Sequence, residues 1–370
     1  MRIAILTHGV SPVGPLYARA FMAQGHEAEV LSLSACEASA LGVPVRVVGP
    51  PEFKPWQTRG RSAYLKAILP VRRAIRELRP DVVFGLYLSS GGLLACLSGH
   101  PHVVASALGS DVNTRMGSRL WRAIFRWQGR RADFLHAVSE PMAETLERVM
   151  GIPRERIVVS PIGVDTAFLA YVEPAARPGR GEILNTRAHW PVYDQPTAVR
   201  AIARLRKEGV ACRLTFMYIR GVESTQRMVD AMGLGDVITF RPGYTHEELP
   251  AVLAEADVYL SASLSDGTSQ SLLEAMSTGL VPVVSDIPAN RPWVEHGKSG
   301  LLFPPGDDAA LAACLKEALA RPELRAAAAP LNRQIVVERG DVNREAARLI
   351  EVFDRCLKGS PAGRDRQGAR

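Results

Sequence analysis

The chain has 370 residues, which is enough for two domains of ordinary size, each with a hydrophobic core of its own. Apolar residues make up 47% of the chain and its formal net charge is +7, a composition that indicates a soluble globular protein. The five cysteines and eight histidines show no CxxC, HExxH or similar spacing, which argues against a disulfide framework or a zinc site.

The first expected strand begins almost at the first residue. Residues 2–7 (RIAILT) have the pattern of a buried strand, and a loop with Gly9 and Gly14 follows at 8–15. A helix and a second strand at 28–33 come next, and this alternation predicts a doubly wound α/β domain. Because the first strand starts at once, we expect no signal peptide and a cytoplasmic location.

Two basic segments follow in the first half of the chain. The first 170 residues hold 20 Lys and Arg against 13 Asp and Glu, so all the excess positive charge lies there, densest at 54–79 and 115–131. In the second segment, Leu120, Ile124 and Trp127 form a stripe at helical spacing, which we expect to face the core. Such helices are typical of proteins that bind an anionic membrane surface, although simply solvated helices fit equally well. Nucleic acid is less favoured, because no binding motif accompanies the charge.

The charge-free stretch at 82–110 lies between these segments. Glycine, proline and serine interrupt it, so it predicts a strand, a helix and another strand, and no membrane span. A Gly-Ser-Asp turn follows, where Asp111 and Asn113 could contact a ligand or could cap the next helix. Residues 170–181 have the Pro, Gly and Ala content of an interdomain linker.

The second half begins with a strand at 182–187 and repeats the alternation of strands and helices. Arg187 ends this strand, and Arg220 and Arg241 follow the ends of later strands. The carboxyl ends of parallel strands meet at one edge of a sheet, where ligands bind.

The most informative stretch lies at 258–284. It reads as a buried strand at 258–262, a small polar turn at 266–269, a helix at 271–279 and another buried strand at 281–284. Strand, turn, helix and strand in this order form the unit of a parallel sheet.

The turn in this stretch has the chemistry of an anion site. Gly267 allows close approach of the backbone, Thr268 and Ser269 offer hydroxyl groups, and the helix start offers unpaired N–H groups. Glu274 lies further along the helix, roughly 10 Å from the turn, which is a suitable distance from a diphosphate to its ribose hydroxyls. Asp266 could accept hydroxyls at the other end of the same ligand. The alternative is a capping Asp and an exposed Glu on an ordinary helix.

These residues resemble the donor-site signature of family 4 retaining glycosyltransferases, which have the GT-B fold of two Rossmann-like domains facing a cleft. In that family two acids separated by seven residues precede a sequence similar to EAM…G.PVV; here the acids are Asp266 and Glu274. Asp266 replaces the more usual Glu, although a variant reading SDGT…SLLEAM is familiar within the family. The likeness extends in outline over most of the chain.

The resemblance implies a role for each matching residue. Glu274 would bind the ribose, the turn from Gly267 through Thr268 to Ser269 would bind the diphosphate together with Arg187, and Asp266 would contact the sugar. The catalytic set would be Asp266, Arg187 and Asp111. Further donor contacts would come from Gly14, Arg220 and Arg241, the last of them near the base.

Some family features are missing. Leu108 stands where many members have a histidine, and the lysine usually found after Arg187 is absent, so Arg220 is a candidate substitute.

The resemblance also implies a domain organisation. We expect an acceptor-binding domain at 1–169, a linker at 170–181, a nucleotide-sugar domain at 182–358 whose last helix returns to the first domain, and a disordered tail at 359–370.

The resemblance implies transfer of a sugar, with retention of configuration, from a nucleoside diphosphate sugar to a glycan or lipid-linked acceptor. The donor turn contains no DxD-like pair, and arginines and helix N–H groups can neutralise the diphosphate, so we expect no metal or other cofactor. A further candidate partner is the anionic inner surface of a membrane, which the protein would bind peripherally. Two alternatives stay open: a nucleotide-sugar epimerase of the same fold, and a non-catalytic sugar-nucleotide binding protein.

Overall fold

The structure is a computed structural model, and it describes residues 1–8, 11–36, 42–49, 62–177, 179–219 and 221–359. The chain divides into two compact units. Unit 1 contains the residues up to Ile162 together with the segment from Val342, and unit 2 is Gly163–Asp341. The segment 170–181, expected as a linker, lies inside unit 2, where the Arg177 guanidinium donates hydrogen bonds to the carbonyl groups of Leu253, Ala256 and Thr278.

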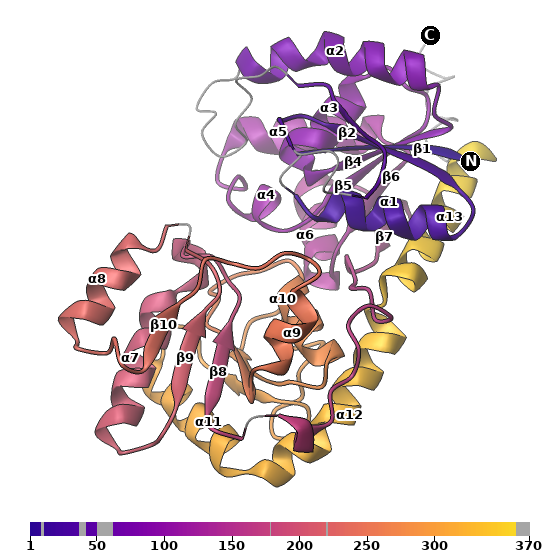
Figure 1. Ribbon diagram of the computed structural model, residues 1–370. Helices are drawn as coiled ribbons and strands as arrows, with labels where there is room; N and C mark the ends of the chain where they lie inside the picture. The colour runs from indigo at the N-terminus through magenta and orange to yellow at the C-terminus, as the bar shows by residue number, and fades with distance from the viewer. Residues whose placement is uncertain (9–10, 37–41, 50–61, 178, 220, 360–370) are drawn as a thin grey trace. The chain divides into compact units, whose positions relative to one another are not determined.

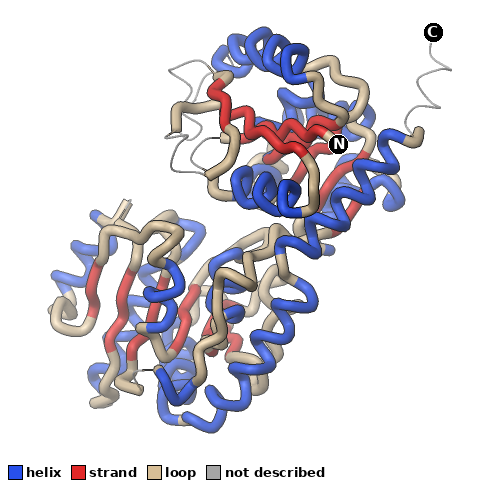
Figure 2. The backbone as a smooth tube through the Cα atoms, turned by 45° about the vertical axis from the view of Figure 1, so that its right-hand side comes forward, coloured by secondary structure: helices blue, strands red, loops and turns tan. Residues whose placement is uncertain are grey.

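Unit 1 is a parallel sheet with helices on both faces (Figures 1 and 2). Within the described residues the strand order is β3-β2-β1-β4-β5-β6-β7. The elements are β1 (Arg2–Thr7), α1 (Val13–Ala23), β2 (Glu27–Ser32), β3 (Val45–Val47), α2 (Ser62–Leu78), β4 (Val82–Leu86), a π-helical turn (Tyr87–Gly91), α3 (Gly92–Leu97), β5 (Val103–Ala107), α4 (Ser110–Asn113), α5 (Arg119–Arg131), β6 (Phe134–Ala137), α6 (Glu140–Met150), β7 (Ile157–Val159) and α13 (Val342–Leu357).

Helix α13, at the end of the chain, completes the core of unit 1. The ring of Phe353 packs against Phe21 of α1 and Phe84 of β4, with centroid distances of 5.6 Å and 5.5 Å. All three rings are fully buried. The sheet therefore has one apolar layer under α1 and α13 and a second one under α2, α3, α5 and α6.

Unit 2 repeats this architecture with the strand order β10-β9-β8-β11-β12-β13, again all parallel within its described residues. Its elements are β8 (Glu182–Asn185), α7 (Gln195–Lys207), β9 (Arg213–Phe216), α8 (Glu223–Ala231), β10 (Ile238–Phe240), α9 (Leu249–Ala254), β11 (Val258–Ser261), α10 (Gln270–Ser277), β12 (Val281–Ser285), β13 (Leu301–Phe303), α11 (Asp308–Ala320) and α12 (Pro322–Arg339). The order reverses between β8 and β11, and crevices for ligands form at such a point beyond the carboxyl ends of the strands.

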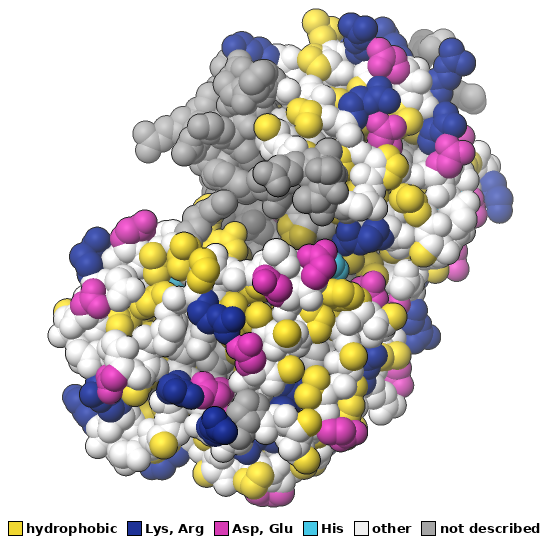
Figure 3. Space-filling view, viewed as in Figure 1, with side chains coloured by type: hydrophobic (Ala, Val, Ile, Leu, Met, Phe, Trp, Pro, Cys, Tyr) yellow, Lys and Arg dark blue, Asp and Glu magenta, His cyan; other side chains and the backbone are white. Residues whose placement is uncertain are grey.

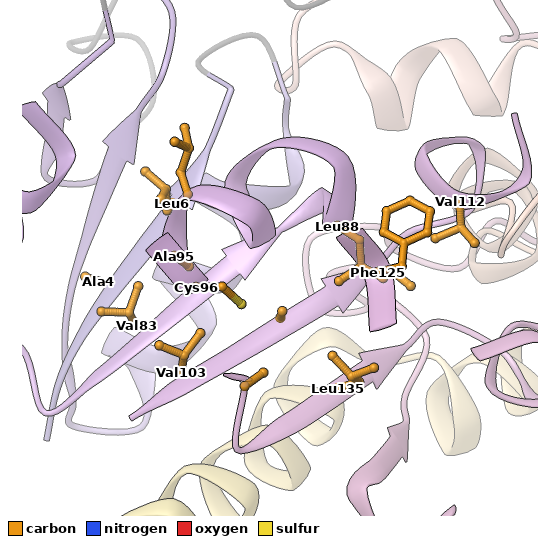
Figure 4. Close-up of a cluster of buried hydrophobic side chains, with 14 of the residues drawn as sticks. Ala4, Leu6, Val83, Leu88, Ala95, Cys96, Val103, Val112, Phe125 and Leu135 are labelled. Carbon is orange, nitrogen blue, oxygen red and sulfur yellow. The ribbon is translucent and has the colours of Figure 1, made fainter. Parts of the chain in front are cut away.

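Helix α5 does not bury the stripe that its sequence suggests. Leu120 and Trp127 are 46% and 40% exposed, whereas Phe125 is fully buried. Figure 4 shows Phe125 beside Leu88 and Val112 in the core of unit 1. The expectation was wrong for Leu120 and Trp127, whereas Ile124 is half-buried. Periodicity cannot tell which of two overlapping apolar faces meets the sheet.

Among the helices of the described residues, none combines the length and the apolar content that crossing a bilayer requires.

Candidate functional site

The candidate site lies where the strand order of unit 2 reverses. One loop, at 186–194, follows β8, and another, at 262–269, follows β11. The backbone N–H of Leu264 donates to the carbonyl oxygen of Val192 at 2.8 Å, which ties the two loops together. This edge of the sheet therefore has a fixed backbone on which side chains can be positioned.

Arg187 is the fixed cation of this site. Its Nη2 donates to Asp266 Oδ2 at 2.6 Å, and its Nη1 donates to Ser271 Oγ at 3.0 Å and to Ser269 Oγ at 3.3 Å. The guanidinium also lies over the ring of Tyr193, with its carbon 4.0 Å from the ring centroid. Burial opposes the charge, but Asp266 and the nearby tyrosines outweigh it and raise the pKa of Arg187, so the group stays charged.

The start of helix α10 lies beside this cation. Ser269 is its N-cap, and its hydroxyl accepts a hydrogen bond from the N–H of Leu272 at 3.3 Å. Gly267, Thr268 and Ser269 are buried. The N–H of Gly267 donates to Asp266 Oδ1 at 2.8 Å, so both carboxylate oxygens of Asp266 already have a donor. A helix N-terminus and a guanidinium thus supply positive potential at one point.

Glu274 lies further along α10 and is half-buried. Its carboxylate makes no hydrogen bond to any of the residues that the structure describes. Burial raises the pKa of Glu274 to about 7, and the attraction of Arg187 partly opposes this shift. A partly desolvated carboxylate without a hydrogen-bond donor is suited to accept hydroxyl groups of a ligand.

One predicted arginine does not join this network. Arg241 follows β10, and its guanidinium pairs with Glu255 at 2.5 Å on the surface. Arg220 lies outside the described residues. The structure thus brings together Arg187, Asp266 and the turn that ends at Ser269.

Asp111, in unit 1, holds the backbone of two neighbouring turns through its carboxylate. Its carboxylate accepts the N–H groups of Leu88, Gly109 and Leu108 at 2.6, 2.9 and 3.1 Å. Burial raises the pKa of Asp111 to about 6, against the effect of these backbone hydrogen bonds. The side chain links the turn after β4 to the loop after β5, and its contacts are those of a loop-shaping residue.

The sequence suggested that Gly14 lies in a loop, and the structure shows that it does not. It belongs to the first turn of α1, where a Cβ atom would come within 2.6 Å of Thr7 Cγ2. Glycine here lets the helix pack closely on β1. The nearby Gly9 lies outside the described residues.

Sequence reasoning missed several polar residues of these edges. In unit 2, Tyr193 supports Arg187, and the hydroxyl of Tyr259 donates to Ser271 Oγ at 2.8 Å. In unit 1, His8 Nε2 lies 2.8 Å from Ser90 Oγ, just beyond β1 and β4, where the strand order reverses. Burial lowers the pKa of His8 to about 4. The position of His8, directly after the first strand, was the available signal.

Comparison with known proteins identifies the two units. Residues 16–168 match the family model described as Glycosyltransferase Family 4, and residues 184–321 match the model described as Glycosyl transferases group 1. Sucrose-phosphate synthase from Thermosynechococcus elongatus has a similar structure, with a TM-score of 0.80 and 16% identity over 97% of this chain and 100% of that one. The chain has the GT-B fold, and each of its units matches a glycosyltransferase family model. This confirms the predicted fold class.

Further proteins resemble this one in structure or in sequence. HepE of Anabaena, solved in complex with UDP and glucose, has a TM-score of 0.77 and 16% identity over 96% of this chain and 99% of its own. WcaL of Salmonella typhimurium, named as a colanic acid biosynthesis glycosyltransferase, is 33% identical over 56% of this chain and 53% of its own length. An MMP α-(1→4)-mannosyltransferase of Mycolicibacterium hassiacum is 26% identical over 65% of this chain and 61% of its own. The GT-B chain thus matches between about half and two thirds of the length of these two curated relatives.

Proposed function

We propose that this GT-B protein transfers a sugar from a nucleoside diphosphate sugar to a hydroxyl group of an acceptor. The observation that carries the proposal is the partly buried Arg187 guanidinium beside the N-terminus of α10, at the reversal of strand order in unit 2. The match of both units to glycosyltransferase models favours transfer over an epimerase or a non-catalytic binding protein.

Each residue of the site has a role in this proposal. Arg187 and the turn Gly267–Ser269 bind the diphosphate, and Glu274 accepts the ribose hydroxyls. Asp266 holds Arg187 and contacts the sugar through the remaining lone pairs of its carboxylate. Arg241 lies near the base, and Asp111 shapes a loop of the acceptor-binding unit.

We infer that transfer proceeds with retention of configuration and without a divalent metal. The bond from the anomeric carbon to the diphosphate breaks, and the acceptor oxygen forms its bond on the same face of the sugar. The acceptor's proton passes to the leaving phosphate oxygen. Arg187 and the N–H groups at the start of α10 stabilise the charge that develops on this phosphate. Full activity in EDTA is the expected result, and complete loss that divalent metal restores would contradict the proposal.

We also infer a glycan or lipid-linked acceptor and a peripheral position on the inner, anionic face of a membrane. The relatives support the first point: one is named for colanic acid biosynthesis and another for the α-(1-6)-mannosylation of a phosphatidylinositol monomannoside. The second point rests on the charge, because all the excess of Lys and Arg lies in the first 170 residues.

Binding of UDP-, GDP- and ADP-sugars, followed by thermal shift and calorimetry, tests the donor site. One of these donors should stabilise the protein, and Glu274→Ala should weaken its binding roughly 10- to 150-fold, because a charged hydrogen bond is lost. The matched control is Glu317→Ala, on the surface of α11 in the same unit. If the wild type and Glu274→Ala bound the donor with equal affinity, Glu274 would not bind the ribose. Turnover of the donor without any acceptor would favour the epimerase.

A further inference from the structure

The outer face of helix α2 presents two leucines to solvent. Leu65 and Leu69 are 68% and 72% exposed, and they lie one turn apart on the same side of the helix. The opposite side of α2 is buried in unit 1 through Ala67, Val71 and Ile75. The two leucines therefore contribute little to the core, and an exposed apolar stripe of this kind indicates an interaction surface.

Arginines continue this stripe toward the end of the helix. An open cavity of about 1060 Å³ adjoins Leu69, and five arginines line it: Arg2, Arg72, Arg73, Arg76 and Arg79. The acid among the lining residues is Glu77, which accepts hydrogen bonds from Arg73 at 2.8 Å and from Arg46 at 3.1 Å. The cavity thus keeps a strong excess of positive charge.

Two of these arginines are available to a ligand. The guanidinium groups of Arg76 and Arg79 make no hydrogen bond or ion pair with the residues that the structure describes. Arg79 also has φ of 49°, in the left-handed region that favours glycine at the end of a helix. An arginine in this position adopts an unfavourable backbone conformation, and its side chain places a cation beside the cavity.

We propose that the outer face of α2 is a docking surface for an anionic lipid bilayer. Leu65 and Leu69 enter the boundary between headgroups and acyl chains, and the arginines at the end of the helix bind lipid phosphate groups. Figure 3 shows hydrophobic side chains next to Lys and Arg over α2. The proposal specifies the membrane-contacting element of the peripheral location inferred above, and it does not depend on the identity of the donor.

Other partners fit this surface less well. A soluble phosphate ligand would use the arginines but leave the leucines exposed. A second copy of the chain would bring two clusters of arginine together across a symmetric interface, where like charges repel. A bilayer with acidic headgroups satisfies both parts of the surface at once.

Flotation with vesicles of phosphatidylcholine, with and without phosphatidylglycerol, tests the proposal at low and high salt. The wild type should float with the acidic vesicles, and more weakly at high salt. Leu65→Ser with Leu69→Ser should reduce the partition coefficient about tenfold or more at both salt concentrations. Arg76→Gln with Arg79→Gly should weaken the preference for phosphatidylglycerol, and glycine suits the backbone at position 79.

The matched control removes a cation and an exposed apolar side chain from unit 2, through Arg227→Gln with Met232→Ser. This variant should float as the wild type does. Three outcomes would overturn the proposal: no binding of the wild type to acidic vesicles, unchanged flotation of the leucine variant, or a dimer in sedimentation that the leucine variant abolishes. Donor binding, measured on the same preparations, reports separately on the proposed function.

Discussion

Arg187 is held by residues from both loops at the candidate site. Asp266 fixes one edge of the guanidinium, Ser271 the other, and Tyr193 covers its face. A cation held in this way is pre-organised for a diphosphate, because little side-chain freedom remains to be lost on binding.

Tyr193 should act through Arg187. Its hydroxyl makes no hydrogen bond to the described residues, so the ring alone holds the guanidinium. Tyr193→Leu should therefore raise the donor KM by roughly 5- to 30-fold, the equivalent of one partly buried cation–π contact. Tyr193→Phe should behave as the wild type in steady-state kinetics. An equal effect of both substitutions would show that the hydroxyl, not the ring, is important.

The raised pKa of Glu274 predicts a specific dependence of stability on pH. The folded protein holds a proton on this carboxyl group up to about pH 7, whereas the unfolded chain releases it at the ordinary pKa near 4.5. The free energy of unfolding therefore falls as pH rises between these values. Glu274→Gln removes this loss of stability. The Tm of the variant minus that of the wild type should therefore be ~2–4 °C larger near pH 8 than near pH 5. A difference in Tm that does not change with pH would contradict the shift.

At the scale of the element, α10 is specified by local signals. Ser269 caps its start, apolar residues form its buried side, and Gly279 follows its end with a φ of 82°. These features lie within a few residues of one another, so the sequence predicted this helix and the position of Glu274 on it.

Helix α5 offers a test of which face is buried. Phe125→Ala should lower the free energy of unfolding by about 3–5 kcal/mol, because it leaves a cavity in the core of unit 1. Trp127→Ala should change it by about 0.5 kcal/mol or less, because its ring is largely outside the core. Chemical denaturation of both variants measures these values. If Trp127→Ala lowered the free energy of unfolding more than Phe125→Ala does, the buried face would be the one that the sequence suggested.

At the scale of the whole molecule, the end of the chain stabilises its beginning. Phe353→Ala on α13 should destabilise unit 1 by about 3–5 kcal/mol, since it removes the ring between Phe21 and Phe84. Hydrogen exchange followed by mass spectrometry should show faster exchange in β1 and β4, while unit 2 is unchanged. Phe303→Ala, in the core of unit 2, is the matched control and should give the reverse pattern. Faster exchange in unit 2 for Phe353→Ala would contradict the assignment of α13.

The sequence by itself determined the features that depend on neighbours in the chain. The alternation of strands and helices, the turn at 266–269 and the place of Glu274 follow from periodicity, capping and glycine positions, which act over a few residues. Asp266 was a candidate because it lies in the turn after a strand of a parallel sheet, whereas Arg187 became one through the family resemblance.

Only the tertiary structure decided which distant residues meet. Strand order places β8 next to β11, and this brings Arg187 to Asp266 across 79 positions of the sequence. Packing against the sheet selected Phe125 over Trp127 on α5, and it left Leu65 and Leu69 of α2 in solvent. These outcomes depend on the shape and position of the neighbouring elements, which the local pattern of polar and apolar residues does not contain.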